Sequence, residues 1–199
     1  MYIIKRTKNK IDSINDNAWK SAEIANINIC NWDEYKRNIK TTAKLLYSDL
    51  GVHVQMQTDE RPLLARFTEQ NGPVCKDSCM EFFISPNEND IRYINFEFNP
   101  FGTIHYSIIA SADEWTYPDK KKDYFEVQSY VDEEKWIIQF FIPFEFTDGI
   151  FGYHTKKMRG NIYKCGADTA KKHYISYYPI YTEEPNFHSP QFFGDFVLE

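Results

Sequence analysis

Large apolar side chains alternate with polar ones along residues 93–107, which read YINFEFNPFGTIHYS. Successive residues of a β-strand point to opposite faces of a sheet. The pattern therefore predicts two strands, each with one apolar and one polar face. Residues 100–102, Pro-Phe-Gly, interrupt the alternation and predict a three-residue hairpin loop, in which the glycine can supply a positive φ.

The length of this loop fixes the register that we expect between the two strands. Apolar residues then meet apolar residues, as Phe98 meets Ile104, and on the other face Glu97 meets His105. A slip of one residue would turn His105 toward the core, so the pattern specifies one register.

Alternation of this kind recurs along most of the chain, and turn residues separate the runs. Sustained helical periodicity is absent, although a short helix around residues 33–38 is possible. About ten short strands and a minor helix predict an all-β fold, an antiparallel β-sandwich that forms a single domain over residues 1–199. Besides the hairpin, the expected strands are residues 41–47, 52–57, 63–67, 80–84, 125–131, 136–142, 162–165, 174–178 and 193–198.

Composition narrows the classes of partner. The chain is 17% aromatic, which favours strands, and carries a formal net charge of -6. An acidic chain binds polyanions poorly, so we expect neither nucleic acid nor a membrane as partner. No apolar run is long enough to cross a bilayer, and the first residues lack the apolar core of a secretory signal. The sequence as written predicts a cytoplasmic location, or an extracellular one if a leader was removed.

The polar faces of the expected strands favour a ligand rich in hydroxyl groups. Asn95, Glu97 and Asn99 share one face, although asparagine is uncommon in strands. Amides and carboxylates can donate to and accept from sugar hydroxyls, and aromatic rings can pack on the apolar face of a sugar ring. The alternative is an ordinary sheet with one face in water.

The segment YINFEFNPFGTI contains the pattern Tyr…Phe-Glu-x-Asn-Pro-x-Gly over a strand and a turn, and it resembles a strand and turn of the family 9 carbohydrate-binding modules. In order along nearly its whole length, the chain resembles this family, whose members are β-sandwiches often attached to xylanases. Each segment is a weak signal by itself, and the ordered set is fairly specific. The other similar segments are NDNAWKSAEIANI, SDLGVHVQMQTDE, KDSCMEFFISP, WIIQFFIPF, RGNIYKCG, YISYYPI and HSPQFFGDFVLE.

The resemblance implies non-catalytic binding of a mono- or oligosaccharide, such as a fragment of xylan or cellulose, and a glycoside hydrolase as a possible partner. In the family, two aromatic rings sandwich a sugar. Tyr177 corresponds to one of them, whereas Val74 and Cys75 stand where the other would lie.

The resemblance also implies specific ligand-binding and metal-binding residues. It places Lys76, Asp77, Glu97 and Asn99 at or near the positions that hydrogen-bond the sugar. Structural calcium is a further expectation from the family. Oxygen ligands near turns suit that ion, and the candidates are Asp49, Asp59 and Glu60.

Two other classes of function remain open at this point. Glycoside hydrolysis requires two carboxylates flanking one bond, and Glu81 and Glu97 could be neighbours on the sheet. No nucleophile, zinc-protease or phosphate-loop motif accompanies them, so we expect no catalytic residue. A sugar-independent interaction module is the third class.

Overall fold

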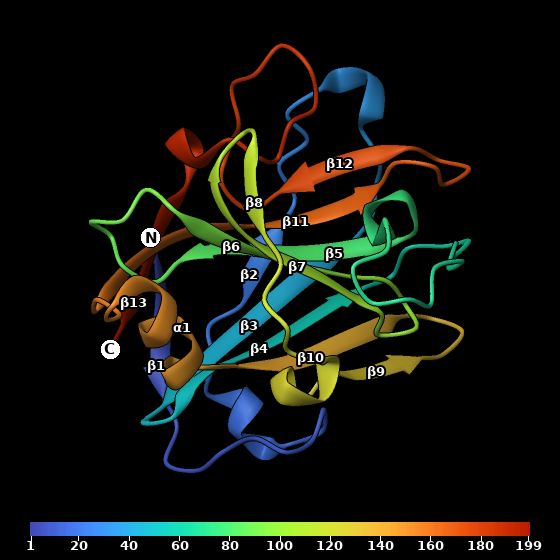
Figure 1. The fold of residues 1–199 in the computed structure, drawn as a ribbon. Coiled ribbons are helices and arrows are strands. Elements are labelled where there is room, and N and C mark those ends of the chain that lie inside the picture. The colour runs from blue at the N-terminus through green and yellow to red at the C-terminus, as the bar shows by residue number, and fades with distance from the viewer.

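The computed structural model describes all residues from Met1 to Glu199, and its strands form two facing layers (Figure 1). The upper layer in the view runs β8-β7-β6-β5-β11-β13, with β12 beside β11, and the lower layer runs β3-β4-β10-β9, with β2 beside β3. Strand β1 joins the two layers by pairing in parallel with β13 and with β3. The β-sandwich prediction is confirmed, with thirteen strands in place of about ten.

The elements have the following bounds. The strands are β1 Tyr2–Arg6, β2 Ala25–Ile27, β3 Thr41–Ser48, β4 Gly51–Thr58, β5 Cys79–Ser85, β6 Tyr93–Phe98, β7 Ile104–Ser111, β8 Glu114–Thr116, β9 Gln128–Val131, β10 Trp136–Pro143, β11 Lys157–Gly166, β12 His173–Ser176 and β13 Gly194–Leu198. The helices are α1 Phe144–Phe151 and the 3-10 turns η1 Asn17–Lys20, η2 Asp33–Tyr35, η3 Val74–Lys76, η4 Lys122–Phe125 and η5 Pro190–Phe192. No helix is long and apolar enough to span a membrane.

The β6–β7 hairpin has the register that its alternation predicts. Phe98 pairs with Ile104 and Glu97 pairs with His105. Gly102 has a φ of 70°, a left-handed conformation that glycine adopts without steric cost. The local pattern was sufficient here because loop length and face alternation both select the same pairing.

The prediction of a strand at residues 63–67 is wrong. The amide of Leu64 donates to the Ser78 hydroxyl, and the amides of Arg66 and Phe67 donate to the Asp77 carboxylate. These amides are therefore satisfied by side chains and do not join a strand ladder. The prediction for residues 125–131 was too long, because η4 occupies its beginning and β9 covers only Gln128–Val131.

Two apolar clusters lie on opposite faces of the upper layer. The main core of 30 buried residues, which includes Phe82, Phe96 and Phe98, fills the space between the layers. A second cluster of 11 buried residues, which includes Phe83 and Tyr163, lies on the other face of the same strands. The outer face of the upper layer is therefore covered by other parts of the chain, not left fully in water.

Candidate functional site

The polar face of the upper layer is a regular row of side chains. Pairing between strands aligns His105, Glu97, Glu81 and Tyr163 across β7, β6, β5 and β11. Glu81 and Glu97 are direct cross-strand partners, so the expectation that they are neighbours is confirmed. We call the row of these four residues, with Asn95 beside it, the polar floor.

The two carboxyl groups of the polar floor are almost completely buried. Glu81 is 2% exposed and Glu97 is 5% exposed. Burial raises the pKa of Glu81 well above its ordinary value, and the neighbouring Glu97 raises it further. Burial also raises the pKa of Glu97, although His105 and a 2.8 Å hydrogen bond from the Asn95 amide oppose the shift. The pair therefore holds a proton more readily than exposed carboxylates do, and a protonated carboxyl both donates and accepts.

A thiol completes a compact group of metal-ligand atoms at this place. The Cys79 sulfur and one oxygen from each of Glu81 and Glu97 all lie within 4.8 Å of one another. Burial raises the pKa of Cys79 as well, which favours the neutral thiol. These three groups are therefore better hydrogen-bonding partners than metal ligands, because a metal requires them deprotonated.

Asp77 and Asn99 hold a loop against the sheet. Both are fully buried. Asn99 donates to the Phe67 carbonyl at 2.8 Å and to Asp77 at 3.0 Å, and the Arg66 guanidinium lies 3.0 Å from Asp77. Although burial raises the pKa of Asp77, hydrogen bonds from the Arg66 and Phe67 amides, Asn99 and the Arg66 side chain bring it below its ordinary value. Their partners within the chain give these two residues a structural role.

The two other residues expected to contact the ligand differ in their place. Lys76 is exposed at the end of η3, a turn that contacts β5, β6 and β11. The amide of Tyr177 donates to the carbonyl of Ile162, and the Tyr177 ring packs on the main core, 6.2 Å from the Tyr2 ring centroid. The structure thus places Tyr177 on the face of the upper layer opposite Glu97. Ligand contact by either residue stays a prediction.

The aromatic rings that lie over or beside the polar floor were not among the expected ligand-binding residues, although His188 begins one of the segments that resemble family 9. The Phe187 ring stacks on Tyr163, with centroids 4.1 Å apart and planes 8° apart. Next to it, His188 lies 4.9 Å from the Phe83 ring, and Trp115 of β8 lies 4.7 Å from His188. Phe187 and His188 belong to an irregular loop, so no period of two indicated which way they point.

Further aromatic rings stand at the two edges of this face. On the β12 side, Tyr174 pairs with Cys165 and packs edge-to-face on Tyr35 at 5.1 Å. On the β8 side, Tyr117 is 52% exposed and lies 5.9 Å from the His105 ring. The arrangement is a polar floor between aromatic edges.

The three expected calcium ligands do not form one site. Asp49 precedes β4 and pairs with Arg6 at 2.5 Å, whereas Asp59 and Glu60 follow β4, a strand about 26 Å long at about 3.3 Å per residue. Asp59 accepts from the Lys40 amide, and Glu60 forms an ion pair with Lys164. These residues do not fit a shared calcium ion, because the strand separates them and an ammonium group already occupies Glu60.

Residues 11–198 match the model of carbohydrate-binding family 9. The chain belongs to this family. Family 9 consists of non-catalytic carbohydrate-binding modules, so the chain is a binding module and Glu81 and Glu97 are not a hydrolytic pair. No protein of curated function matches this family 9 module.

Solved structures with the same fold support the assignment. A protein from Bacteroides uniformis ATCC 8492, provisionally assigned as carbohydrate-binding, superposes with a TM-score of 0.83 at 25% identity, over 99% of this chain and 98% of that one. A family 9 module from Caldicellulosiruptor kristjanssonii in complex with cellotriose superposes with a TM-score of 0.67 at 13% identity, over 100% and 93% of the chains. A family 9 module from the same organism in complex with glucose superposes with a TM-score of 0.65 at 13% identity, over 99% of this chain and 94% of that one. At this identity the last two show the shared fold alone.

Proposed function

We propose that this family 9 module binds a glucose-containing saccharide on the polar floor, over Glu81 and Glu97. The observation that carries the proposal is the cross-strand carboxyl pair, 2% and 5% exposed, on rigid strands that aromatic rings surround. Perturbed carboxyl groups concentrate at functional sites, and these two have no structural ion pair to explain their burial.

The chemistry of the floor suits sugar hydroxyls. A protonated carboxyl can donate one hydrogen bond and accept another, as a hydroxyl does, so Glu81 and Glu97 can hold neighbouring hydroxyls in a defined orientation. His105, at the partly exposed end of the row, adds a ring nitrogen. Buried polar groups of this kind reject ligands that cannot complete their hydrogen bonds.

Phe187 is the stacking ring in this proposal. It now covers Tyr163, and it belongs to a loop that has no strand pairing of its own. We propose that the loop moves outward when the saccharide enters, and that the Phe187 ring packs on the sugar ring in place of Tyr163. An aromatic ring packs on the C–H face of a sugar through the same apolar contact.

Cellotriose and glucose are the first ligands to test, because related family 9 modules have been solved with each of them. Xylan fragments are the second class to test, because the modules that the sequence resembles are often attached to xylanases. Association with a glycoside hydrolase is part of the same proposal and would place the module next to the polysaccharide that such an enzyme cuts.

Calorimetric titration of the full chain with glucose, cellotriose and xylotriose tests the proposal. We expect Phe187→Leu to weaken binding by about tenfold to a hundredfold, since it keeps apolar bulk and removes the flat ring. Glu97→Gln should weaken binding at the floor while preserving its shape. Tyr177→Leu is the matched control, because it removes an aromatic ring from the opposite face of the layer. Equal affinity of Phe187→Leu and the unmodified chain, with loss of binding in Tyr177→Leu, would overturn the assignment of the site.

A further inference from the structure

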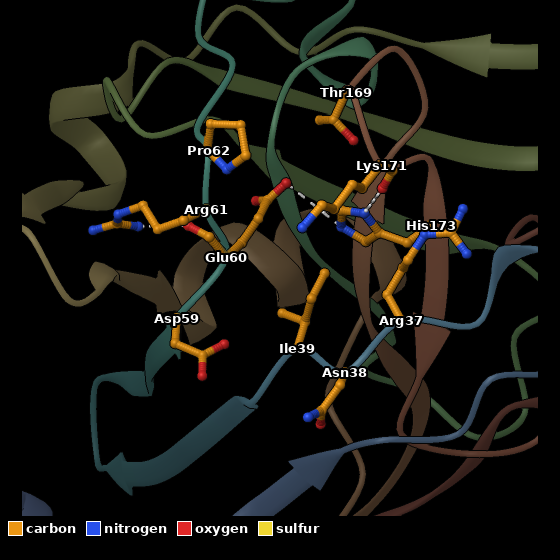
Figure 2. A pocket seen from close by; sticks show the side chains of 10 residues that line it. All are labelled: Arg37, Asn38, Ile39, Asp59, Glu60, Arg61, Pro62, Thr169, Lys171 and His173. Atoms are coloured by element: carbon orange, nitrogen blue, oxygen red, sulfur yellow. Dashed lines mark hydrogen bonds and ion pairs between the residues drawn. The ribbon is translucent and has the colours of Figure 1, made fainter.

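A second polar pocket lies at one end of the sandwich (Figure 2). It has a volume of about 290 Å³ and is formed by three segments: residues 37–39 before β3, residues 59–62 after β4, and residues 169–173, which run from the β11–β12 loop to the first residue of β12. Ile39 is its only hydrophobic lining residue. Its volume is just below the usual range of small-molecule sites, which begins at about 300 Å³, and its lining is far more polar than theirs.

The buried end of the pocket is a group of three charged or titratable side chains. Glu60 is 3% exposed, and His173 and Lys164 are fully buried. The Lys164 ammonium lies 2.8 Å from Glu60 Oε2, and Figure 2 shows the Glu60 carboxylate pointing toward the His173 ring, whose Nε2 lies 3.6 Å from Glu60 Oε1. Lys164 also donates to the carbonyls of Cys79 and Cys165, at 3.1 and 2.6 Å. Two of its hydrogen-bond donors are therefore used by carbonyls, and its charge is paired with Glu60.

The facing atoms of Glu60 and His173 are both hydrogen-bond acceptors. His173 Nδ1 lies 2.7 Å from the Lys171 carbonyl, an acceptor, so Nδ1 carries the ring proton. Burial, and then the charge of Lys164, lower the pKa of His173 to about 3, so the ring is neutral and Nε2 presents a lone pair. Neither Nε2 nor Oε1 has a hydrogen-bond donor from the protein. Two buried acceptors that face each other require donors from a bound molecule.

The charges of the pocket restrict that molecule. Two cationic side chains, from Arg37 and Lys171, line the pocket against two acidic ones, from Asp59 and Glu60, and the Arg61 guanidinium points away to the carbonyls of Asp132, Glu133 and Lys135. With Lys164 behind Glu60, a cationic donor such as an amine or a metal ion would meet net positive charge. Hydroxyl groups donate hydrogen bonds without carrying charge. An acidic group on the same molecule would be attracted by the positive charges of Lys171 and Arg37.

We propose that this pocket is a second carbohydrate site, in which two hydroxyls of one sugar unit donate to His173 Nε2 and Glu60 Oε1, and which prefers an acidic sugar. It lies on the other face of β11 from the polar floor, since Lys164 follows Tyr163 in the strand. The proposal does not depend on the polar floor, and either site can fail without the other.

Nitrogen-15 spectra of the histidine side chains of the full chain, titrated with glucuronate, glucose and Zn²⁺, test the proposal. We expect glucuronate to shift the His173 Nε2 resonance saturably, and glucose to do so about tenfold more weakly. Lys171→Glu, at the exposed rim, should reduce glucuronate binding at least tenfold with little effect on glucose, whereas Lys172→Glu, the next exposed residue, should not. Phe187→Leu should leave the His173 shift unchanged.

Several outcomes would overturn the second site. No saturable shift of His173 with either sugar would mean that water alone satisfies the two acceptors. A shift with Zn²⁺ and none with sugars would make the pocket a metal site. Loss of the sugar-induced His173 shift in Phe187→Leu, with the unliganded spectrum preserved, would mean that the signal comes from the polar floor.

Discussion

The buried carboxyl of Glu60 and the buried carboxyl pair of Glu81 and Glu97 are stabilised in different ways in this family 9 module. Glu60 lies 2.8 Å from the ammonium of Lys164, which also donates hydrogen bonds to two backbone carbonyls. Glu81 and Glu97 face each other and form no close ion pair with a lysine or arginine. Burial raises the pKa of both, although the charge of Lys164 partly opposes the shift at Glu81. At Glu60 an ion pair offsets the cost of burying a charged carboxylate, whereas at Glu81 and Glu97 the raised pKa favours the neutral form, which is less costly to bury.

The two places differ in how much hydrogen-bonding capacity their carboxyl groups have left for a ligand. One oxygen of the Glu60 carboxylate is paired with the buried Lys164, and only the other oxygen faces His173. The Glu81 and Glu97 carboxyls carry few internal hydrogen bonds, so more of their hydrogen-bonding capacity is available. Three variants, ordered from the largest expected effect to the smallest, test this contrast.

The largest effect should come from Lys164→Met. The substitution leaves Glu60 buried without its cation, and breaking a buried pair from one side costs about 3–5 kcal/mol. Denaturant unfolding at pH 7 measures the change in the free energy of unfolding. Adding Glu60→Gln to the same chain should recover part of the loss. A loss below about 1 kcal/mol would show that the pair does not stabilise the fold.

The second effect concerns the pH dependence of stability and Glu81→Gln. The folded pKa of Glu81 is raised, so its proton is retained in the folded chain and lost in the unfolded chain above about pH 4.5. Its contribution to stability therefore falls as pH rises from that value, by up to about 1.4 kcal/mol per pH unit until the folded pKa is reached.

Unfolding free energies of the unmodified chain and of Glu81→Gln, measured from pH 5 to pH 8, check this sign. We expect the stability of the variant relative to the unmodified chain to increase with pH, because the amide cannot ionise. Parallel curves would contradict a raised pKa at Glu81.

The smallest effect should come from Asp168→Ala. Its ion pair with Arg66 is 3.0 Å long, but both side chains are nearly half exposed, at 44% and 46%. Exposed pairs contribute about 0–1 kcal/mol, less at high salt. Unfolding at low and high salt should show a loss within that range that shrinks with salt. A loss equal to that of Lys164→Met would mean that burial is not what separates the two kinds of pair.

The sequence was most informative where structure is local. Alternation and loop length predicted the β6–β7 register, including the pairing of Glu97 with His105. Alternation along the expected strand at residues 174–178 also puts Tyr177 on the same face as Ile175, and the structure packs both against the main core. That shared face was the signal that Tyr177 points away from the polar floor.

Contacts between distant segments could not be predicted in the same way. Phe187 stacks on Tyr163 from an irregular loop, and Glu60 meets Lys164 across 104 residues of sequence. Neither contact leaves a periodic trace, because loops have no fixed face and a single ion pair has no repeat. Resemblance to family 9 indicated the class of ligand, and the geometry was needed to locate the carboxyl pair and the second pocket.

The most direct test of saccharide binding on the polar floor is carbon-13 NMR of the glutamate carboxyl groups during titration of the full chain with cellotriose. The account predicts that the Glu81 and Glu97 resonances shift saturably, with the same dissociation constant as calorimetry gives. Unchanged Glu81 and Glu97 resonances at a cellotriose concentration that saturates the calorimetric signal would contradict it.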